Sequence, residues 1–319
     1  MREGVNVESV TAEAGGFVLQ TSQGCLEARN VVLATGGAFQ VPFTPELAAD
    51  LPESLHQIHS MAYRNAAQLP AGGVLVVGSG QSGTQIAEDL MLEGRQVHLA
   101  LGKAPRYSRF YRGKDMLDWL DELGRDGRIS GISLGRDKLT SPYVTGRDGG
   151  RDIDLYDFAD RGMQLYGRIA KISAAAVYFE PTVNFSLENA DAFNRGFKGM
   201  VDAYVADRNI DAPREAPSVA RAPLAEPELL DFAAAGVTSV IWATGLKQDC
   251  SWVDSAALDE AGQIRHLDGA TEIPGLYYFR TSGLLGSGAN WFDPTPIDAG
   301  RIAEQIAANS TLTARQDCG

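Results

Sequence analysis

The sequence predicts an α/β fold built from two three-layer domains with parallel sheets. A glycine-rich string, Gly78–Gly83, lies between an apolar strand and a helical pattern. Two apolar runs, ending near residues 33 and 242, both continue into Ala-Thr-Gly. Of the 319 residues 35 are glycine, above the usual ~7%, and they gather at the ends of such runs. Strands that are apolar on both faces are typical of parallel sheets, and glycines at their ends permit tight turns and close approach of the backbone to a ligand.

Composition excludes several classes of protein. The length suits about two domains of ~150 residues. With 28 Lys and Arg against 41 Asp and Glu, the net charge of -13 disfavours nucleic acid and anionic lipid as partners. No apolar run approaches the ~18 residues of a membrane span, and the N-terminus lacks the pattern of a secretion signal. Cys25, Cys250 and Cys318 form neither a CxxC pair nor a metal-ligand cluster. We expect a cytoplasmic protein without a metal site.

The first 68 residues predict a strand meander and then a linker. Residues 5–10 and 17–21 have strand patterns, and glycines mark the turns between them. The apolar run at residues 31–34 predicts a buried strand. Prolines from Pro42 to Pro52 interrupt the chain that follows.

Residues 73–101 predict a β-α-β unit. An apolar strand at 73–77 precedes a helical pattern that ends near Gly94, and a second apolar strand follows at 97–101. The string Gly78-Ser79-Gly80-Gln81-Ser82-Gly83 lies between the first strand and the helix. This context makes a GxGxxG string informative.

Each glycine of the string has a physical role in binding a dinucleotide. Gly78 allows the tight turn, Gly80 lets the main chain approach a pyrophosphate, and Gly83 lets the helix pack against the strand. Free N–H groups and the helix dipole then hold the anion. We predict that Gly78, Ser79, Gly80, Gln81, Ser82 and Gly83 bind a nucleotide; a strand-helix turn without a ligand is the alternative.

The charges after this unit favour NADP over NAD. An NAD site places an acidic residue at the end of the second strand, but there is none between Glu93 and Asp115. Guanidinium groups suit a 2′-phosphate, and a solvated basic loop is the alternative. The six cations in this stretch are Arg95, Lys103, Arg106, Arg109, Arg112 and Lys114. We predict that Lys103, Arg106 and Arg109 contact the cofactor.

The rest of the chain predicts further elements of both domains. The predicted strands are 176–179, 237–242 and 276–279, and the predicted helices are 189–207 and 297–308. A proline-rich stretch at 212–227 predicts a crossing between domains.

Together these motifs resemble the flavin-containing monooxygenase-like family, in its bacterial branch of flavoprotein oxidoreductases. The resemblance covers nearly the whole chain. The matching strings are VLATG at 32–36, HSMAYR at 59–64, VLVVGSGQSG at 74–83, YRGKD at 111–115, TGRDGGRDIDL at 145–155, VIWATG at 240–245 and IPGLYYF at 273–279.

The resemblance implies a two-dinucleotide-binding flavoprotein that uses FAD and NADP. In this family NADPH reduces FAD, and a C4a-hydroperoxyflavin formed with dioxygen oxygenates a small nucleophile or a ketone; the protein supplies positioning and a dry site. Residues 1–68 and 220–319 would form the FAD-type domain and 69–219 the NADP domain. The Ala-Thr-Gly crossings would contribute Thr35, Gly36, Thr244 and Gly245 to cofactor binding.

The match to the family is incomplete in two places. His59 and Tyr63 resemble the end of the fingerprint FxGxxxHxxxY, but Glu53 and Leu55 stand where Phe and Gly are expected. The pair would act either in catalysis or as a packed hinge, so we assign no catalytic residue. The family's first GxGxxG, which binds the FAD pyrophosphate, is absent, so about 100 residues of the first domain would be missing.

Two alternatives to an enzyme of this family are open, and the first follows from that absence. One is a non-catalytic NADP-binding protein, or a half-protein that needs a partner chain to supply the FAD unit. The other is a disulphide reductase of the same architecture, which would need a CxxC pair that the sequence lacks.

Overall fold

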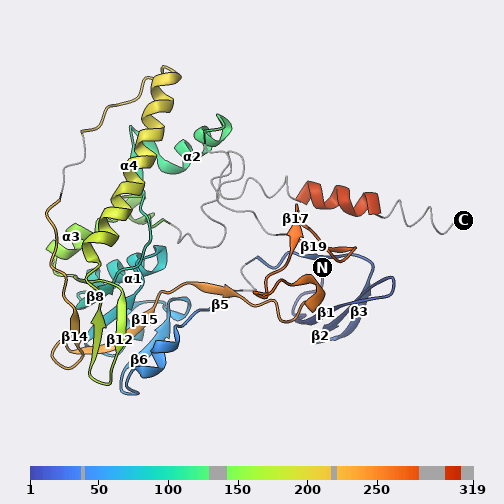
Figure 1. Cartoon of the computed structure of the whole chain (residues 1–319), viewed down its shortest axis with the longest axis horizontal. Coiled ribbons are helices and arrows are strands. Elements are labelled where there is room, and N and C mark those ends of the chain that lie inside the picture. The colour runs from blue at the N-terminus through green and yellow to red at the C-terminus, as the bar shows by residue number, and fades with distance from the viewer. Residues whose placement is uncertain (37–39, 129–141, 217–220, 280–298, 310–319) are drawn as a thin grey trace, which may run out of the picture. The chain divides into compact units, whose positions relative to one another are not determined.

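The structure is a computed structural model, and it describes residues 1–36, 40–128, 142–216, 221–279 and 299–309 (Figure 1). The chain divides into two compact units. Among the described residues, unit 1 comprises 1–36, 40–41, 246–279 and 299–309, and unit 2 comprises 42–128, 142–216 and 221–245.

The unit boundaries differ from those predicted for the domains. Residues 42–68 and 221–245 belong to unit 2, although the sequence analysis groups them with the FAD-type domain. The reason is strand pairing. Strand β6 (His56–His59), inside the predicted linker, and strand β15 (Val237–Trp242) lie in the same sheet as the predicted β-α-β unit.

Unit 2 is built on a five-stranded parallel sheet of order β11-β8-β7-β15-β6. Every residue of β7 and β8 is buried, as their unbroken apolar sequences predict. The predicted 73–101 unit is therefore confirmed. Besides β6 and β15, the sheet contains β7 (Gly73–Val77), β8 (Val97–Ala100) and β11 (Gln164–Tyr166).

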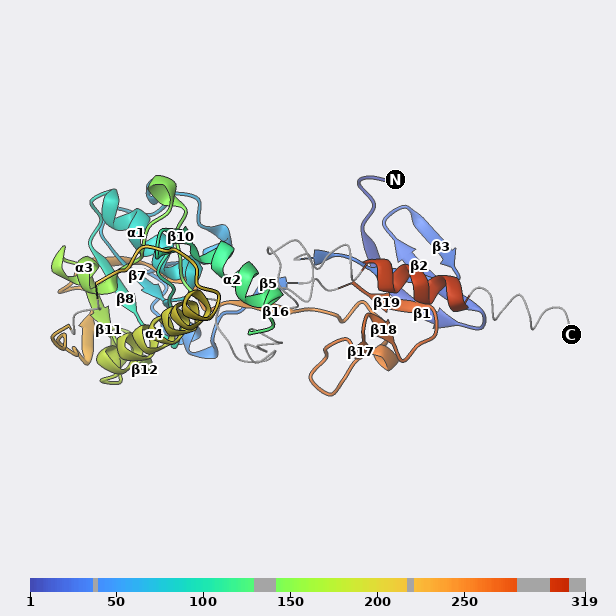
Figure 2. The same ribbon diagram turned by 90° about the horizontal axis from the view of Figure 1, so that it is seen from above.

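A helical layer and an antiparallel sheet cover the two faces of this parallel sheet. Val74, Val76 and Ile241 pack against the helices, whereas Leu75, Val77 and Val240 pack against the antiparallel sheet β12-β13-β14. Figures 1 and 2 show these layers from two directions. Because side chains alternate along a strand, each strand feeds both cores. The covering elements are α1 (Gln81–Leu92), α3 (Leu155–Asp160) and α4 (Val183–Asp207) on one face and β12 (Ile169–Ile172), β13 (Ala176–Phe179) and β14 (Leu229–Asp231) on the other.

Helix α4 begins at Val183, six residues before the predicted start. Val183 and Leu187 are buried and extend the apolar stripe toward the N-terminus. Pro181 lies just ahead of the first turn, where a proline is compatible with helix initiation. The unit also contains the short 3-10 segments η2 (Glu46–Asp50), η3 (Ser60–Ala62), η4 (Ala66–Gln68) and η5 (Arg147–Gly149).

The YRGKD string forms a hairpin that leads into a helix. Strands β9 (Phe110–Tyr111) and β10 (Lys114–Asp115) pair through a turn in which Arg112 and Gly113 both have positive φ. The Asp115 carboxylate accepts the Leu117 N–H and caps α2 (Met116–Arg125). The fully buried indole of Trp119 donates to the Tyr111 carbonyl oxygen at 2.7 Å, which fixes the hairpin on the helix.

Unit 1 contains a three-stranded meander, β1-β2-β3, and a sheet of order β17-β18-β19-β4, in which β4 and β19 are parallel. A common core unites them and includes Val10, Phe17, Leu33 and Tyr278. The predicted N-terminal strands are confirmed. Residues 299–309 are helical; residues 297 and 298 of the predicted closing helix lie outside the described part of the chain. The strands are β1 (Val7–Glu13), β2 (Gly16–Thr21), β3 (Gly24–Ala28), β4 (Val31–Leu33), β17 (His266–Leu267), β18 (Ala270–Thr271) and β19 (Leu276–Tyr278), with η6 (Ser255–Ala257).

Where the chain passes from unit 1 to unit 2 and back, strands β5 (Gln40–Pro42) and β16 (Leu246–Gln248) pair with each other.

Within the described ranges no helix has the length and apolarity to cross a bilayer. The same ranges contain no group of three or more His, Cys, Asp or Glu side chains that could hold a metal ion.

Candidate nucleotide-binding site

Gly78 makes the turn that ends β7. Its φ of +107° lies in a region that side chains disfavour, and a Cβ there would overlap the carbonyl oxygen of Ala243. The Gly78 N–H donates to the Ala100 carbonyl oxygen at 2.9 Å, which holds the turn against β8. Only glycine fits, and this confirms the turn that the sequence predicts at this position.

Gly83 brings the first turn of α1 against that same turn. A Cβ on Gly83 would overlap the carbonyl oxygen of Gly78 and would contact the Ala243 side chain at 3.2 Å. The helix axis therefore lies closer to the strand than any other residue at this position would permit. This is the close packing that the third glycine of the string predicts.

The N-terminus of α1 has the features of an anion cradle. Its N-cap is Gly80, which has no side chain to cap the helix, so the first N–H groups have no partner within the helix. The helix dipole adds positive potential at this end. The Ser79 hydroxyl is buried and accepts the Gly102 N–H at 2.9 Å, so it fixes the loop to the end of β8. Backbone amides of Gly80, Gln81 and Ser82 remain to bind an anion, and this geometry fits a pyrophosphate.

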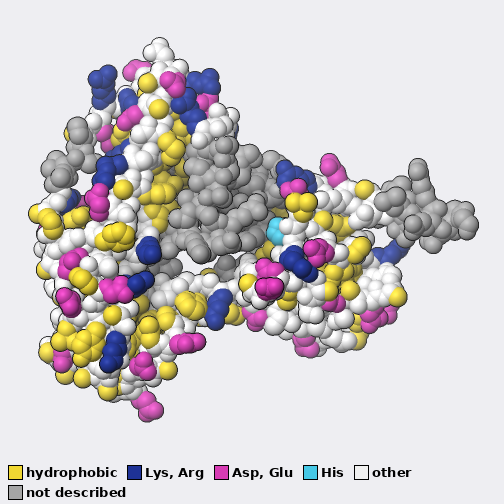
Figure 3. All heavy atoms as spheres, in the orientation of Figure 1, with side chains coloured by type: hydrophobic (Ala, Val, Ile, Leu, Met, Phe, Trp, Pro, Cys, Tyr) yellow, Lys and Arg dark blue, Asp and Glu magenta, His cyan; other side chains and the backbone are white. Residues whose placement is uncertain are grey.

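The six cations between Glu93 and Asp115 are less available than the sequence suggests. Within the described ranges, Lys103 is exposed and makes no hydrogen bond or ion pair, whereas the other five have protein partners. Figure 3 shows, on one face of the molecule, Lys and Arg side chains interspersed with Asp and Glu. The pairs are Arg106 with Asp191, Arg109 with Asp115, Arg112 with Asp202 and Lys114 with Glu122, while Arg95 donates to the carbonyl oxygens of Ala66, Pro70 and Gly72.

The second Ala-Thr-Gly segment is held by hydrogen bonds at the edge of unit 2. The Thr244 hydroxyl donates to the Phe43 carbonyl oxygen at 2.5 Å, and the Gly245 carbonyl oxygen accepts the Phe43 N–H at 3.1 Å. His59 Nε2 lies 3.0 Å from that Gly245 oxygen. Thr244 and Gly245 therefore join two segments of chain, and their place in cofactor binding stays a prediction.

His59, the last residue of β6, and Tyr63 both form hydrogen bonds within the protein. His59 Nδ1 accepts the Met61 N–H at 3.2 Å, so Nε2 carries the proton that is donated to Gly245. Burial lowers the pKa of His59, which keeps the ring neutral, and the bond to Gly245 opposes this effect only in part. The Tyr63 hydroxyl donates to Asp89 of α1 at 2.7 Å; burial first, and then this carboxylate, raises its pKa. These contacts favour the packed-hinge interpretation of the pair.

The comparisons with known proteins agree with this architecture. Residues 1–119 match the family described as pyridine nucleotide-disulphide oxidoreductase. Over 293 residues the chain is 29% identical to an uncharacterized CzcO-like oxidoreductase of Geobacillus kaustophilus, covering 88% of this chain and 67% of that protein. It is 25% identical over 294 residues to the uncharacterized oxidoreductase CzcO of Bacillus subtilis, covering 91% and 68%.

A flavin-containing monooxygenase from Stenotrophomonas maltophilia has a similar fold, with a TM-score of 0.55 and 16% identity over 96% of this chain and 71% of that chain. The chain is thus similar in sequence to uncharacterized oxidoreductases and in fold to a flavin-containing monooxygenase. The predicted α/β fold of two-dinucleotide-binding flavoproteins is confirmed. The sequence matches agree with the predicted class of oxidoreductase.

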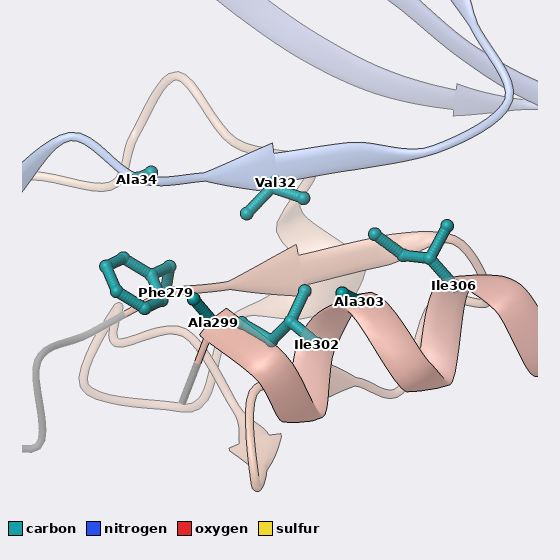
Figure 4. Close-up of a pocket in the computed structure, with 7 residues that line it drawn as sticks. All are labelled: Val32, Ala34, Phe279, Ala299, Ile302, Ala303 and Ile306. Atoms are coloured by element: carbon teal, nitrogen blue, oxygen red, sulfur yellow. The ribbon is translucent and has the colours of Figure 1, made fainter. Parts of the chain in front are cut away.

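Unit 1 offers an apolar pocket and an unpartnered hydroxyl near the first Ala-Thr-Gly. Thr35 Oγ1 is buried without a partner in the described part of the chain, and Gly36 has a φ of +55°. A pocket of about 370 Å³ lies between β4, the end of β19 and helix 299–309 (Figure 4). Its lining is wholly apolar: Val32, Ala34, Phe279, Ala299, Ile302, Ala303 and Ile306.

The residues present therefore fit the two predicted cofactors, NADP and FAD, unequally. A nicotinamide dinucleotide fits the cradle in unit 2. The described residues of unit 1 contain no glycine-rich helix start to hold the FAD diphosphate, and the apolar pocket has no charged group to replace it. The free thiols of Cys25, which is exposed, and Cys250, which is buried, do not form a redox pair.

The carboxylates that pair with the cations are the residues that the sequence analysis missed. Asp191 and Asp202 lie on α4, more than 80 residues after the cations that they bind. A signal for them exists in the sequence. Polar residues at 191, 194, 198 and 202 recur at helical spacing, which predicts one polar stripe on this helix.

Proposed function

We propose that the chain binds NADP(H) at the N-terminus of α1 and serves an NADPH-dependent flavin monooxygenase reaction on a small nucleophilic or ketone substrate. The observation that carries the proposal is the cradle itself, in which Gly78 and Gly83 admit no side chain and the amides of residues 80–82 have no side-chain cap. The monooxygenase chemistry is proposed from the resemblance of the sequence motifs to the monooxygenase-like family, and the fold shared with the Stenotrophomonas enzyme is compatible with it.

Each part of the cradle has a separate proposed role in binding NADP(H). The amides of Gly80, Gln81 and Ser82 hold the pyrophosphate, and the dipole of α1 favours its charge. The Lys103 ammonium, next to the Gly102 that Ser79 fixes, binds the 2′-phosphate. Arg106 and Arg109 are the other proposed contacts, but each must share its charge with a carboxylate. The bound cofactor supplies the hydride.

A partner that completes the flavin site is the second candidate. In this form of the proposal the chain is a half-protein, and the FAD diphosphate is held by a unit outside the described residues. Within those residues β4 is an edge strand, and Val32, 41% exposed, lies beside the apolar pocket. An open edge and an apolar pocket favour contact with a further strand and helix.

Calorimetry of nucleotide binding tests the cradle. The Lys103→Ala variant should bind NADP+ roughly tenfold more weakly and NAD+ as the wild type does, because only the former carries the 2′-phosphate. Lys171→Ala, an exposed lysine of β12, is the matched control and should change neither affinity. Equal loss for both nucleotides, or no binding by the wild type, contradicts the proposal.

Absorbance and oxygen consumption test the flavin part. Wild-type protein is titrated with NADPH with and without added FAD. If the chain holds FAD alone, it purifies yellow and consumes dioxygen with NADPH. If NADPH binds but FAD does not, the half-protein form of the proposal is favoured. A colourless protein that oxidises NADPH at an enzymatic rate contradicts a flavin mechanism.

A further inference from the structure

We propose that Asp191 of α4 lowers the preference of the site for the phosphorylated cofactor by competing with the 2′-phosphate for Arg106. The inference rests on the proposed binding of NADP(H) at α1. Arg106 Nε lies 2.5 Å from Asp191 Oδ1, and the two side chains are 21% and 19% exposed. Asp152 adds a second carboxylate, 3.9 Å from Arg106 Nη1. The guanidinium charge is therefore already balanced inside the protein.

Two sets of backbone contacts place Arg106 beside the cradle. On one side, Gly102 is tied to Ser79 of the glycine-rich string at 2.9 Å, only four residues before Arg106. On the other side, Arg106 forms a parallel bridge with Tyr143, whose N–H donates to the Pro105 carbonyl oxygen at 3.0 Å.

The segment that carries Tyr143 also contacts α1. The Gln85 amide donates to the Val144 carbonyl oxygen at 2.6 Å, half a turn beyond Gly83. Arg106 thus lies between a loop fixed to the glycine-rich string and a segment fixed to the first turns of α1. The backbone of Arg106 is therefore part of the loops next to the start of α1.

The helix that carries Asp191 is bonded to the loop that carries Arg106. Three residues along the same face of α4, the buried Asn194 accepts the Ser108 N–H at 2.8 Å and donates to the Ser108 hydroxyl at 3.0 Å. These two bonds fix α4 to the loop that carries Arg106. This part of α4 therefore cannot move away from the loop without breaking a buried polar pair.

The consequence for the cofactor is electrostatic. A 2′-phosphate needs a guanidinium with free charge, and a carboxylate in contact with that guanidinium both occupies its donors and repels the phosphate. NAD has no such phosphate. Asp191 therefore weakens NADP binding selectively, leaves Lys103 as the main contact, and acts through Arg106 as a positioning residue.

The test measures binding of NADP+, NAD+ and adenosine 2′,5′-bisphosphate by calorimetry. Asp191→Asn should tighten NADP+ and the bisphosphate roughly fivefold to tenfold and leave NAD+ unchanged. Asp191→Glu, which keeps the charge, should bind as the wild type does. Asp202→Asn is the control. Asp202 also lies on α4, and its carboxylate lies 2.9 Å from the Arg112 guanidinium. Loss of this ion pair should leave the ratio of the NADP+ and NAD+ affinities unchanged.

A double variant shows whether the effect passes through Arg106. In Arg106→Gln the replacement of Asp191 should change the NADP+ affinity less than about twofold. If Asp191→Asn does not fold by circular dichroism, Asp191→Ser is the second neutral variant. An unchanged affinity ratio, an equal gain for NAD+, or a full gain in the double variant overturns the inference while the proposed function stands. Wild-type protein that binds neither nucleotide overturns both.

Discussion

His59 Nε2 lies 3.0 Å from the carbonyl oxygen of Gly245, and the same oxygen accepts the Phe43 N–H. The chain passes between its units next to these residues, after Val41 and after Gly245. One imidazole and one backbone amide therefore converge on a single oxygen and hold both segments to the end of β6. We interpret His59 as the residue that fixes this crossing.

Removal of the His59 ring should loosen the crossing. His59→Ala leaves the Gly245 oxygen with one donor and the Met61 N–H without its acceptor, which should cost about 1 kcal/mol. Limited proteolysis near residues 43 and 245 should become faster. The exposed neighbour His56, changed to Ala, is the control and should leave cleavage unchanged. Identical cleavage of the His59 and His56 variants contradicts this role.

Two helical glycines should respond in opposite ways to alanine. Gly83→Ala drives a methyl group into the Gly78 carbonyl oxygen. The free energy of unfolding should fall by about 3 kcal/mol or more, as expected for severe overpacking. Nucleotide binding should be lost as well. Gly199→Ala lies within α4 with nothing within 4 Å of the new carbon, and should stabilise by about 0.5–1 kcal/mol. Urea denaturation of both variants measures this; a tolerated Gly83→Ala would show that the turn is not tightly packed.

Stability should fall in mild acid because of His98. The ring is 2% exposed on β8; Nδ1 lies 3.1 Å from the Tyr166 hydroxyl, and Nε2 has no partner in the described residues. Burial lowers its pKa from 6.5 to about 4. The unfolded chain therefore binds the proton first, so stability is full above pH 6.5 and declines by up to about 3 kcal/mol as the pH falls to 4.

Denaturation at several pH values between 7 and 4 checks this prediction. His98→Leu should flatten the pH dependence in that window because the titrating group is gone. Tyr166→Phe keeps the histidine and should keep the slope. A His98→Leu protein with the wild-type slope would assign the acid sensitivity to other groups.

Arg95 should contribute more to stability than a surface arginine. Its guanidinium donates to the carbonyl oxygens of Ala66, Pro70 and Gly72, so Arg95→Ala removes three hydrogen bonds to the backbone. The oxygens of Ala66 and Pro70 keep a second donor, the Leu69 N–H and the Thr238 hydroxyl. We expect a loss of about 1–3 kcal/mol in urea denaturation. Arg161→Ala removes an exposed pair with Asp157 at 3.4 Å and should cost less than about 0.5 kcal/mol. Equal effects would contradict the importance of these backbone contacts.

Local sequence patterns predicted the parts of the fold that depend on near neighbours. The β-α-β unit at residues 73–101 follows from two apolar runs, a helical pattern and glycines whose positions permit no side chain. The meander of unit 1 follows from alternation and turn residues. Strand β6 was missed because its sequence, His-Gln-Ile-His, is neither apolar nor regularly alternating; pairing with β15 makes it a strand.

The sequence by itself determined the anion cradle, since a glycine string between a strand and a helix leaves backbone amides free whatever surrounds it. Only the tertiary structure decided which cations remain available to a ligand. A count of nearby charges treats Lys103, Arg106 and Arg109 alike, but helix α4 and the cap of α2 bring carboxylates to the two arginines and none to the lysine. Charge at a site depends on what packs against it, and packing joins residues that are far apart along the chain.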